Sequence, residues 1–164
     1  AGDRDWAAHL GTVVVRSCAG FMFLIATAIL LAGPWLLPTF LDAADPNAAA
    51  TVEVALLLLW PAAAYQLFDG LYFGSSFCLR ATGDTAVPAA TALVLSWGLN
   101  VPLAHTLVFD AEQAWIPGLQ QFGLGALGGW LALMIYVVLL GGFMYRRWRS
   151  ERWREVDLWG RAAD

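Results

Sequence analysis

The chain has 164 residues, of which 60% are hydrophobic and only 13% are charged. A soluble globular protein carries about 25% charged residues, so this chain has about half of the charge that a water-facing surface needs. The composition therefore excludes an ordinary water-soluble domain, and the net charge of −4 decides little. Four long runs with few or no charges instead predict an all-α integral membrane protein with four transmembrane helices.

The first predicted helix covers residues 12–40 and contains a charge-free run from 17 to 41. That run exceeds the roughly 20 apolar residues that cross a bilayer. Gly33-Pro34 marks the approach to its end, since proline interrupts helical hydrogen bonding. The preceding residues form no signal peptide, because they lack a basic n-region and a cleavage site. They begin in a polar stretch without Met, so we expect the chain to be part of a longer protein.

The second predicted helix, residues 46–80, carries one charge deep in its apolar run, the carboxylate of Asp69. At a rise of about 1.5 Å per residue, Asp69 lies roughly 17 Å from Arg80 and roughly 24 Å from Glu53. The span between Glu53 and Arg80, roughly 40 Å, matches a bilayer with its headgroup regions. Asp69 is therefore placed near the midplane, too deep for its carboxylate to extend to the interface.

A carboxylate at that depth costs at least about 2.5 kcal/mol on insertion scales and is expected to face a protein interior or a wet cavity. Three polar neighbours share its helix face at spacings of −4, +3 and +7, namely Tyr65, Tyr72 and Ser76. Gln66 is adjacent to this stripe. We therefore predict that Asp69 binds and releases H⁺ or Na⁺. The alternative is a protonated Asp69 that hydrogen-bonds to a neighbouring helix and serves only to pack it.

The third predicted helix covers residues 85–109. Gly83 breaks the preceding helix, and either Asp84 or Thr85 is positioned to cap the next one. Asn100 lies one turn after a serine, and the two form a small polar face on this helix. Both interhelical hydrogen bonding and a place in a substrate pathway are open for Asn100.

The fourth predicted helix covers residues 122–147 and is followed by a polar tail, 148–164. All nine basic residues are Arg, and they lie near the start of the first helix, after the second helix and in the tail. The loops at 40–52 and 110–121 contain none. Because positively charged residues stay on the cytoplasmic side, both ends and the loop at 80–88 are predicted to be cytoplasmic. We expect a multi-pass protein of the cell inner (plasma) membrane.

The segment YQLFDGLYFGSSFCLRATGDTAVP, residues 65–88, resembles the tenth helix and following cytoplasmic loop of the multidrug and toxic compound extrusion (MATE) family. That family's pattern is roughly FQ-x-x-D-x-x-Q followed by G-x-LRG-x-GDT-x-x-P. The residues that match it in order and spacing are Tyr65, Gln66, Asp69, Leu79, Arg80, Gly83, Asp84 and Thr85. Residues 95–107 and 123–148 resemble the eleventh and twelfth helices, and residues 1–20 resemble the junction of the eighth and ninth. The resemblance covers essentially the whole chain.

The resemblance implies a transporter with twelve helices in two lobes of six, of which this chain supplies the last four helices of the second lobe. It implies export of organic cations or amphipathic drugs in exchange for Na⁺ or H⁺ by alternating access. In the NorM-like branch, the acidic residue of the tenth helix belongs to the cation site, and Asp69 occupies that place. The candidates for supporting this site or lining the pathway are Tyr65, Gln66, Tyr72, Ser76 and Asn100.

Two places in the sequence depart from the family pattern. Ala81 stands where a glycine usually follows Leu-Arg, which stiffens the loop. Leu71–Phe73 lacks the polar residue that the family often has there. The first eight helices, including the acidic partner expected on the seventh, are outside this chain, so we expect the chain by itself not to transport.

The sequence predicts no enzyme, since a single deep Asp offers no partner for acid–base catalysis. It predicts no metal site either, because His105 has no Cys, His or carboxylate at ligand spacing. No cofactor is expected beyond the coupling ion. The expected partners are membrane lipid, the remaining helices of the transporter and a cationic or amphipathic substrate, with no nucleic acid. Two alternatives stay open: a lipid or polysaccharide flippase of the same superfamily, and a standalone four-helix membrane scaffold.

Overall fold

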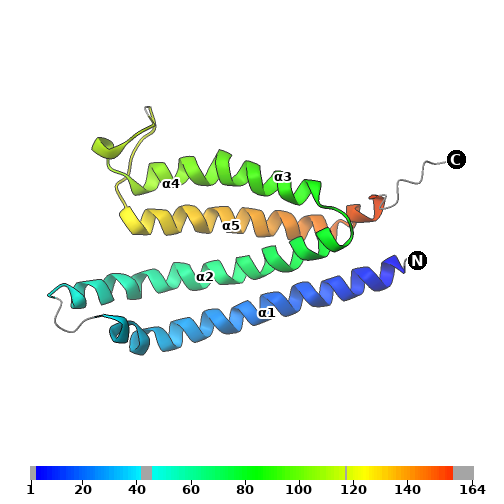
Figure 1. The fold of residues 1–164 in the computed structure, drawn as a ribbon, viewed down its shortest axis with the longest axis horizontal. Helices are drawn as coiled ribbons and strands as arrows, with labels where there is room; N and C mark the ends of the chain where they lie inside the picture. The colour runs from blue at the N-terminus through cyan, green and yellow to red at the C-terminus, as the bar shows by residue number, and fades with distance from the viewer. Residues whose placement is uncertain (1–2, 42–45, 117, 157–164) are drawn as a thin grey trace.

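A computed structural model describes residues 3–41, 46–116 and 118–156. These residues form five α-helices, which are α1 (Arg4–Leu36), α2 (Ala48–Ala81), α3 (Ala86–Leu95), α4 (Val101–Val108) and α5 (Gly125–Arg149). A short π-helix, Ser96–Asn100, joins α3 to α4, so that these two helices form one continuous rod. Across the layer the order is α1, α2, α5 and then the α3–α4 rod (Figure 1). The last helix in the chain, α5, thus lies between α2 and the α3–α4 rod.

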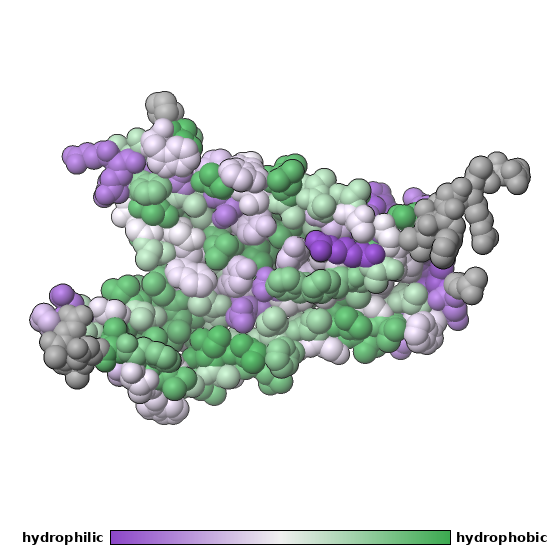
Figure 2. All heavy atoms as spheres, in the orientation of Figure 1, coloured by the Kyte–Doolittle hydropathy of each residue, from purple (hydrophilic) through white to green (hydrophobic). Residues whose placement is uncertain are grey.

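Four helical stretches are long and apolar enough to cross a membrane: Arg4–Phe40, Ala48–Ala81, Ala86–Val108 and Gly125–Arg149. Many large apolar side chains are exposed on the outer faces of these helices, as Figure 2 shows for one side of the molecule. Such exposure is unfavourable in water and suits contact with lipid. The all-α architecture with four membrane-spanning helices, predicted from the charge-free runs, is confirmed.

The helix ends differ from the predicted ones for local reasons. The first helix begins at Arg4 rather than at residue 12, because the carboxylate of Asp3 accepts hydrogen bonds from the backbone N–H groups of Asp5 and Trp6. The last helix begins at Gly125 and runs to Arg149, so the first two residues of the predicted tail are still helical. Residues 42–45 lie outside the described residues.

Glycines set the closest helix contacts. A Cβ atom at Gly74 would lie 2.9 Å from the Cα atom of Val15, which places α1 directly against α2. A Cβ atom at Gly141 would lie 2.8 Å from the carbonyl oxygen of Phe68, which places α5 equally close on the other side of α2. Close backbone approach at glycine is a common basis of helix association in membranes.

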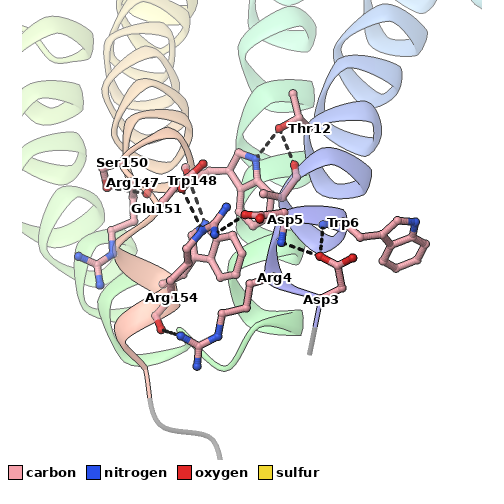
Figure 3. Close-up of polar contacts among 12 residues, drawn as sticks. Asp3, Arg4, Asp5, Trp6, Thr12, Arg147, Trp148, Ser150, Glu151 and Arg154 are labelled. Carbon is pink, nitrogen blue, oxygen red and sulfur yellow. Dashed lines mark hydrogen bonds and ion pairs between the residues drawn. The ribbon is translucent and has the colours of Figure 1, made fainter. Parts of the chain in front are cut away.

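The end of α5 is fastened to the start of α1. The indole of Trp148 lies over Gly11, where a Cβ atom would overlap the ring. Trp153 stacks on Trp148 with the ring centroids 5.0 Å apart and the planes at 6°. Arg154 then reaches the carboxylate of Asp5 at 2.7 Å (Figure 3). The first helix and the last helix therefore have their Arg-bearing ends on the same side of the bundle.

Candidate functional site

Asp69 lies in the middle of α2 and is buried, with 8% of its surface exposed. Its carboxylate accepts a hydrogen bond from the hydroxyl of Tyr65, one helical turn earlier, at 3.3 Å. The two side chains meet because residues four apart share one face of a helix. The structure therefore places this carboxylate in the protein interior, although the chain offers it no cationic partner among the described ion pairs.

Helix α5 supplies the other wall of this site. The ring of Trp130 meets the ring of Tyr65 edge-on, with the centroids 6.4 Å apart and the planes at 75°. Tyr136 of the same helix lies close enough to interact electrostatically with both Asp69 and Tyr72. One phenol, that of Tyr65, thus binds the carboxylate directly, and the phenols of Tyr72 and Tyr136 lie in the same part of the bundle. We call these four residues the Asp69 cluster.

Tyr136 was not among the residues predicted from the sequence. It is one tyrosine in the apolar run LALMIYVVLL, and a single helix pattern does not reveal which residue of another helix it will face. Its polar hydroxyl in the centre of a membrane span was the only available signal.

The other predicted site residues are divided between different faces. Gln66 points toward α1, where its amide donates to the sulfur of Met22 at 3.8 Å. Ser76 is buried at 3% exposure, and the neighbouring Ser75 is fully buried with no hydrogen-bond partner for its hydroxyl among the described residues. Asn100 is half-buried at the end of the π-helix, in the rod that lies across α5 from α2. The structure thus brings Tyr65 to Asp69 by a hydrogen bond, keeps Tyr72 on the same face of α2, and leaves Gln66 and Asn100 elsewhere.

The Leu-Arg-x-x-Gly-Asp-Thr motif forms the turn between α2 and α3. Gly83 has a φ of +85° and donates its N–H to the carbonyl of Arg80 at 3.0 Å. The N–H of Asp84 bonds to the carbonyl of Leu79 at 2.9 Å. This pair of hydrogen bonds is a Schellman motif, which ends a helix with a left-handed residue, usually glycine. Thr85 takes the N-cap position of α3 without a side-chain cap hydrogen bond.

Asp84 has a second role in this turn. Its carboxylate is 4% exposed and binds Nε of Arg147 on α5 at 2.7 Å. The side chain of Leu79 is fully buried in the same part of the bundle, together with Met144. Arg80, by contrast, is exposed. The motif therefore ends α2, starts α3 and fastens both to the end of α5.

His105 is buried at 2% exposure near the end of α4. Its Nε2 atom accepts hydrogen bonds from the backbone N–H groups of Trp115 and Ile116, at 3.1 and 3.2 Å. His105 therefore holds the loop after α4 in place. The described residues contain no group of three or more His, Cys, Asp or Glu side chains arranged to hold a metal ion.

The oxygen atoms of the Asp69 cluster would suit a hard cation as ligands. A carboxylate and phenol oxygens are hard ligands, which suit H⁺ or an alkali or alkaline-earth cation better than a soft metal. In a low-dielectric interior, a carboxylate must be protonated or paired with a cation to avoid a large desolvation cost. The cluster contains no nucleophile paired with a general base.

The class of protein defined by this fold is a multi-pass helical membrane protein with a buried carboxylate, Asp69, in the middle of one span. The probable multidrug resistance protein NorM of Brucella suis is 31% identical over 148 residues, which are 90% of this chain and 29% of that protein. The multidrug resistance protein NorM of Burkholderia vietnamiensis is 35% identical over 133 residues, or 81% of this chain and 26% of that protein. The probable NorM protein of Pseudomonas putida is 32% identical over 157 residues, or 93% of this chain and 31% of that protein.

The resemblance to the MATE family is thereby confirmed, since the chain matches the C-terminal part of NorM-type members of that family over about nine-tenths of its length. It spans only about three-tenths of the length of these relatives. No family model matches the chain, and no solved structure matches it.

Proposed function

We propose that this chain is part of a multidrug efflux transporter that exports organic cations or amphipathic drugs in exchange for Na⁺ or H⁺. The observation that carries the proposal is the buried Asp69 in a chain similar to proteins named for multidrug resistance. A buried carboxylate in a membrane span is costly, so it is retained where a function requires it.

In this proposal, Asp69 is the coupling residue. One conformation of the transporter exposes the carboxylate to a cation on one side of the membrane, and the other conformation exposes it to the opposite side. A cation shifts the balance between two conformations only if it binds them with different affinities. Tyr136 of α5 lies near Asp69 of α2, so a small movement of one helix against the other would change the polar surroundings of the carboxylate.

The proposal extends to the position in the cell. We propose that the protein lies in the plasma membrane, and the distribution of arginines along the chain supports an orientation with its Arg-bearing end in the cytoplasm. The drug or cation pathway would be completed by the helices of the longer protein, which we expect to be its principal protein partners.

The test is Asp69→Asn in the full-length transporter that carries these residues, reconstituted into vesicles with an imposed Na⁺ or H⁺ gradient. Asparagine keeps the size and hydrogen bonding of the side chain but removes the charge. We expect loss of cation-driven efflux at unchanged expression. The matched control is Asp110→Asn, which changes an exposed carboxylate in the loop after α4. Normal efflux by Asp69→Asn would show that Asp69 only packs α2.

A further inference from the structure

Two adjoining hollows lie on the face of α5 that is turned toward α3. The first is an apolar groove of about 440 Å³, lined by Ala90, Thr91, Val94 and Leu95 of α3 and by Leu139 and Phe143 of α5. The second is a pocket of about 200 Å³ at the Arg-bearing end of α5, lined by Phe143, Arg146, Arg147, Ser150 and Arg152. Phe143 lines both, so the apolar groove adjoins a pocket with three guanidinium groups at this side chain.

The pocket has an excess of positive charge. Asp84 binds Arg147 and neutralises it. Arg146 and Arg152 are exposed, and neither forms an ion pair with any carboxylate among residues 3–41, 46–116 and 118–156. The neighbouring carboxylate of Glu151 binds Arg154 instead, at 2.9 Å. Two unpaired guanidinium groups therefore remain, and guanidinium groups bind phosphate oxygens with paired, charge-assisted hydrogen bonds.

The groove continues this pocket into the depth of the membrane. Its α5 wall, from Leu139 to Phe143, rises only about 6 Å along the helix axis. That length is short for seating another helix, which is about 10 Å across, but it suits one segment of an acyl chain. The exposed side chain of Val94 on the other wall is 66% accessible, so the groove is open on the side that faces away from the bundle.

We propose that this composite site binds an anionic phospholipid, with its phosphate between Arg146 and Arg152 and one acyl chain in the groove between α3 and α5. Basic pockets between spanning helices at the membrane surface are suited to anionic headgroups. The lipid would bridge α3 and α5 at the end of the bundle where Asp84 and Arg147 already join them. This inference does not depend on the transport activity proposed above.

The test measures lipid retention by native mass spectrometry of the purified full-length protein after removal of its own lipid and addition of phosphatidylglycerol or phosphatidylcholine. We expect preferential retention of phosphatidylglycerol. The double variant Arg146→Gln with Arg152→Gln should bind phosphatidylglycerol roughly 10- to 30-fold more weakly. Each arginine near an anionic lipid surface strengthens binding by about fivefold, and the variant removes two of them. The matched control is Arg16→Gln with Arg149→Gln, which removes the same charge from two exposed arginines outside the pocket. Equal weakening by both double variants would show that the lipid is attracted by the positive charge of the protein in general and not bound at this pocket, and would overturn the proposal.

A second arm tests the groove separately from the headgroup pocket. Val94→Trp fills the groove with an indole, and we expect it to lower phosphatidylglycerol retention by a similar factor without changing the elution volume of the protein. Val13→Trp, at a residue of α1 that is 45% exposed, is the control for adding a tryptophan to a lipid-facing surface. Unchanged lipid retention by Val94→Trp would show that only a phosphate ion is recognised. A loss of the folded monomer by Val94→Trp alone would show that a helix of the longer protein covers the groove. Either result overturns the proposal.

Discussion

The carboxylate of Asp84, in the turn after α2, binds Nε of Arg147, near the end of α5, at 2.7 Å. The two residues are 63 positions apart in the chain, and Asp84 is almost completely buried. The pair joins the α2–α3 turn to the last helix, α5. It lies at the end of the bundle where α1 begins and α5 ends (Figure 1).

The first prediction concerns this pair. Asp84→Asn should lower the free energy of unfolding by about 1–3 kcal/mol, because Arg147 then lacks its charged partner in a partly buried place. Thermal unfolding of the purified protein in detergent measures the change. Arg147→Gln should have a similar effect, and the double variant should lose less than the sum of the two. Arg149→Gln, two residues further along and exposed, is the control. Strict additivity of the two single changes would show that the pair contributes nothing.

The second prediction uses two adjacent glycines of α5. Gly141→Ala should destabilise the protein by about 1–3 kcal/mol, because its Cβ atom would lie 2.8 Å from the carbonyl oxygen of Phe68 on α2. Gly142→Ala should be neutral or slightly stabilising, since a Cβ atom there has no neighbour within 4 Å and alanine favours the helix. The measurement is the midpoint of thermal unfolding for both variants. Equal midpoints would mean that α5 does not approach α2 so closely.

The comparison of Gly141 with other glycines shows what the sequence could and could not reveal. Gly125 and Gly129 of α5 are four residues apart, a spacing that favours close helix contact, but a Cβ atom at Gly125 has no neighbour within 4 Å. The closest approach to α4 is at Gly128, beside the carbonyl of Leu107, whereas a Cβ atom at Gly129 would make an ordinary contact with Val108 at 3.6 Å. The spacing of small residues therefore predicted a close contact but not the face of the helix that makes it, because that face depends on where the neighbouring helices lie.

The four spans were predictable because the bilayer fixes both the length and the charge content of a helix that crosses it. The Asp69–Tyr65 contact could also be predicted from the sequence, since it lies within one helix and follows from the helical repeat. The contribution of Tyr136 and the pair of Asp84 with Arg147 depend on the packing of α5 against distant segments. One sequence contains no direct information on such distant pairs.

The third prediction concerns orientation. Arg80 lies in the last turn of α2, at the same end of the bundle as Arg154, and the Gln113 loop lies at the other end (Figure 1). In a variant without native cysteines, Gln113→Cys should react with an impermeant thiol reagent in intact cells, and Arg80→Cys should react only after the membrane is opened. Both positions are exposed, and neither requires a positive φ. Reaction of Arg80→Cys alone in intact cells would reverse the proposed orientation.

The last prediction concerns Tyr136, which only the structure brings to Asp69. Tyr136→Phe removes one hydroxyl from the Asp69 cluster and keeps the ring that fills the space between α2 and α5. If this hydroxyl helps to hold the coupling cation, the cation concentration for half-maximal efflux should rise about 3- to 10-fold, because a single polar contact contributes about 1 kcal/mol.

The control for this change is Tyr145→Phe, which removes the hydroxyl of a tyrosine on the same helix that is 36% exposed and outside the cluster. Efflux in vesicles over a series of Na⁺ concentrations and pH values, with expression and thermal midpoint measured for each variant, separates a change in cation affinity from a change in folding. A purely structural Tyr136 would lower the thermal midpoint and leave the half-maximal cation concentration unchanged. A shift in that concentration at an unchanged midpoint would instead place Tyr136 beside Asp69 in cation binding, since a substitution that only loosens the packing of α5 has no reason to alter the cation dependence selectively.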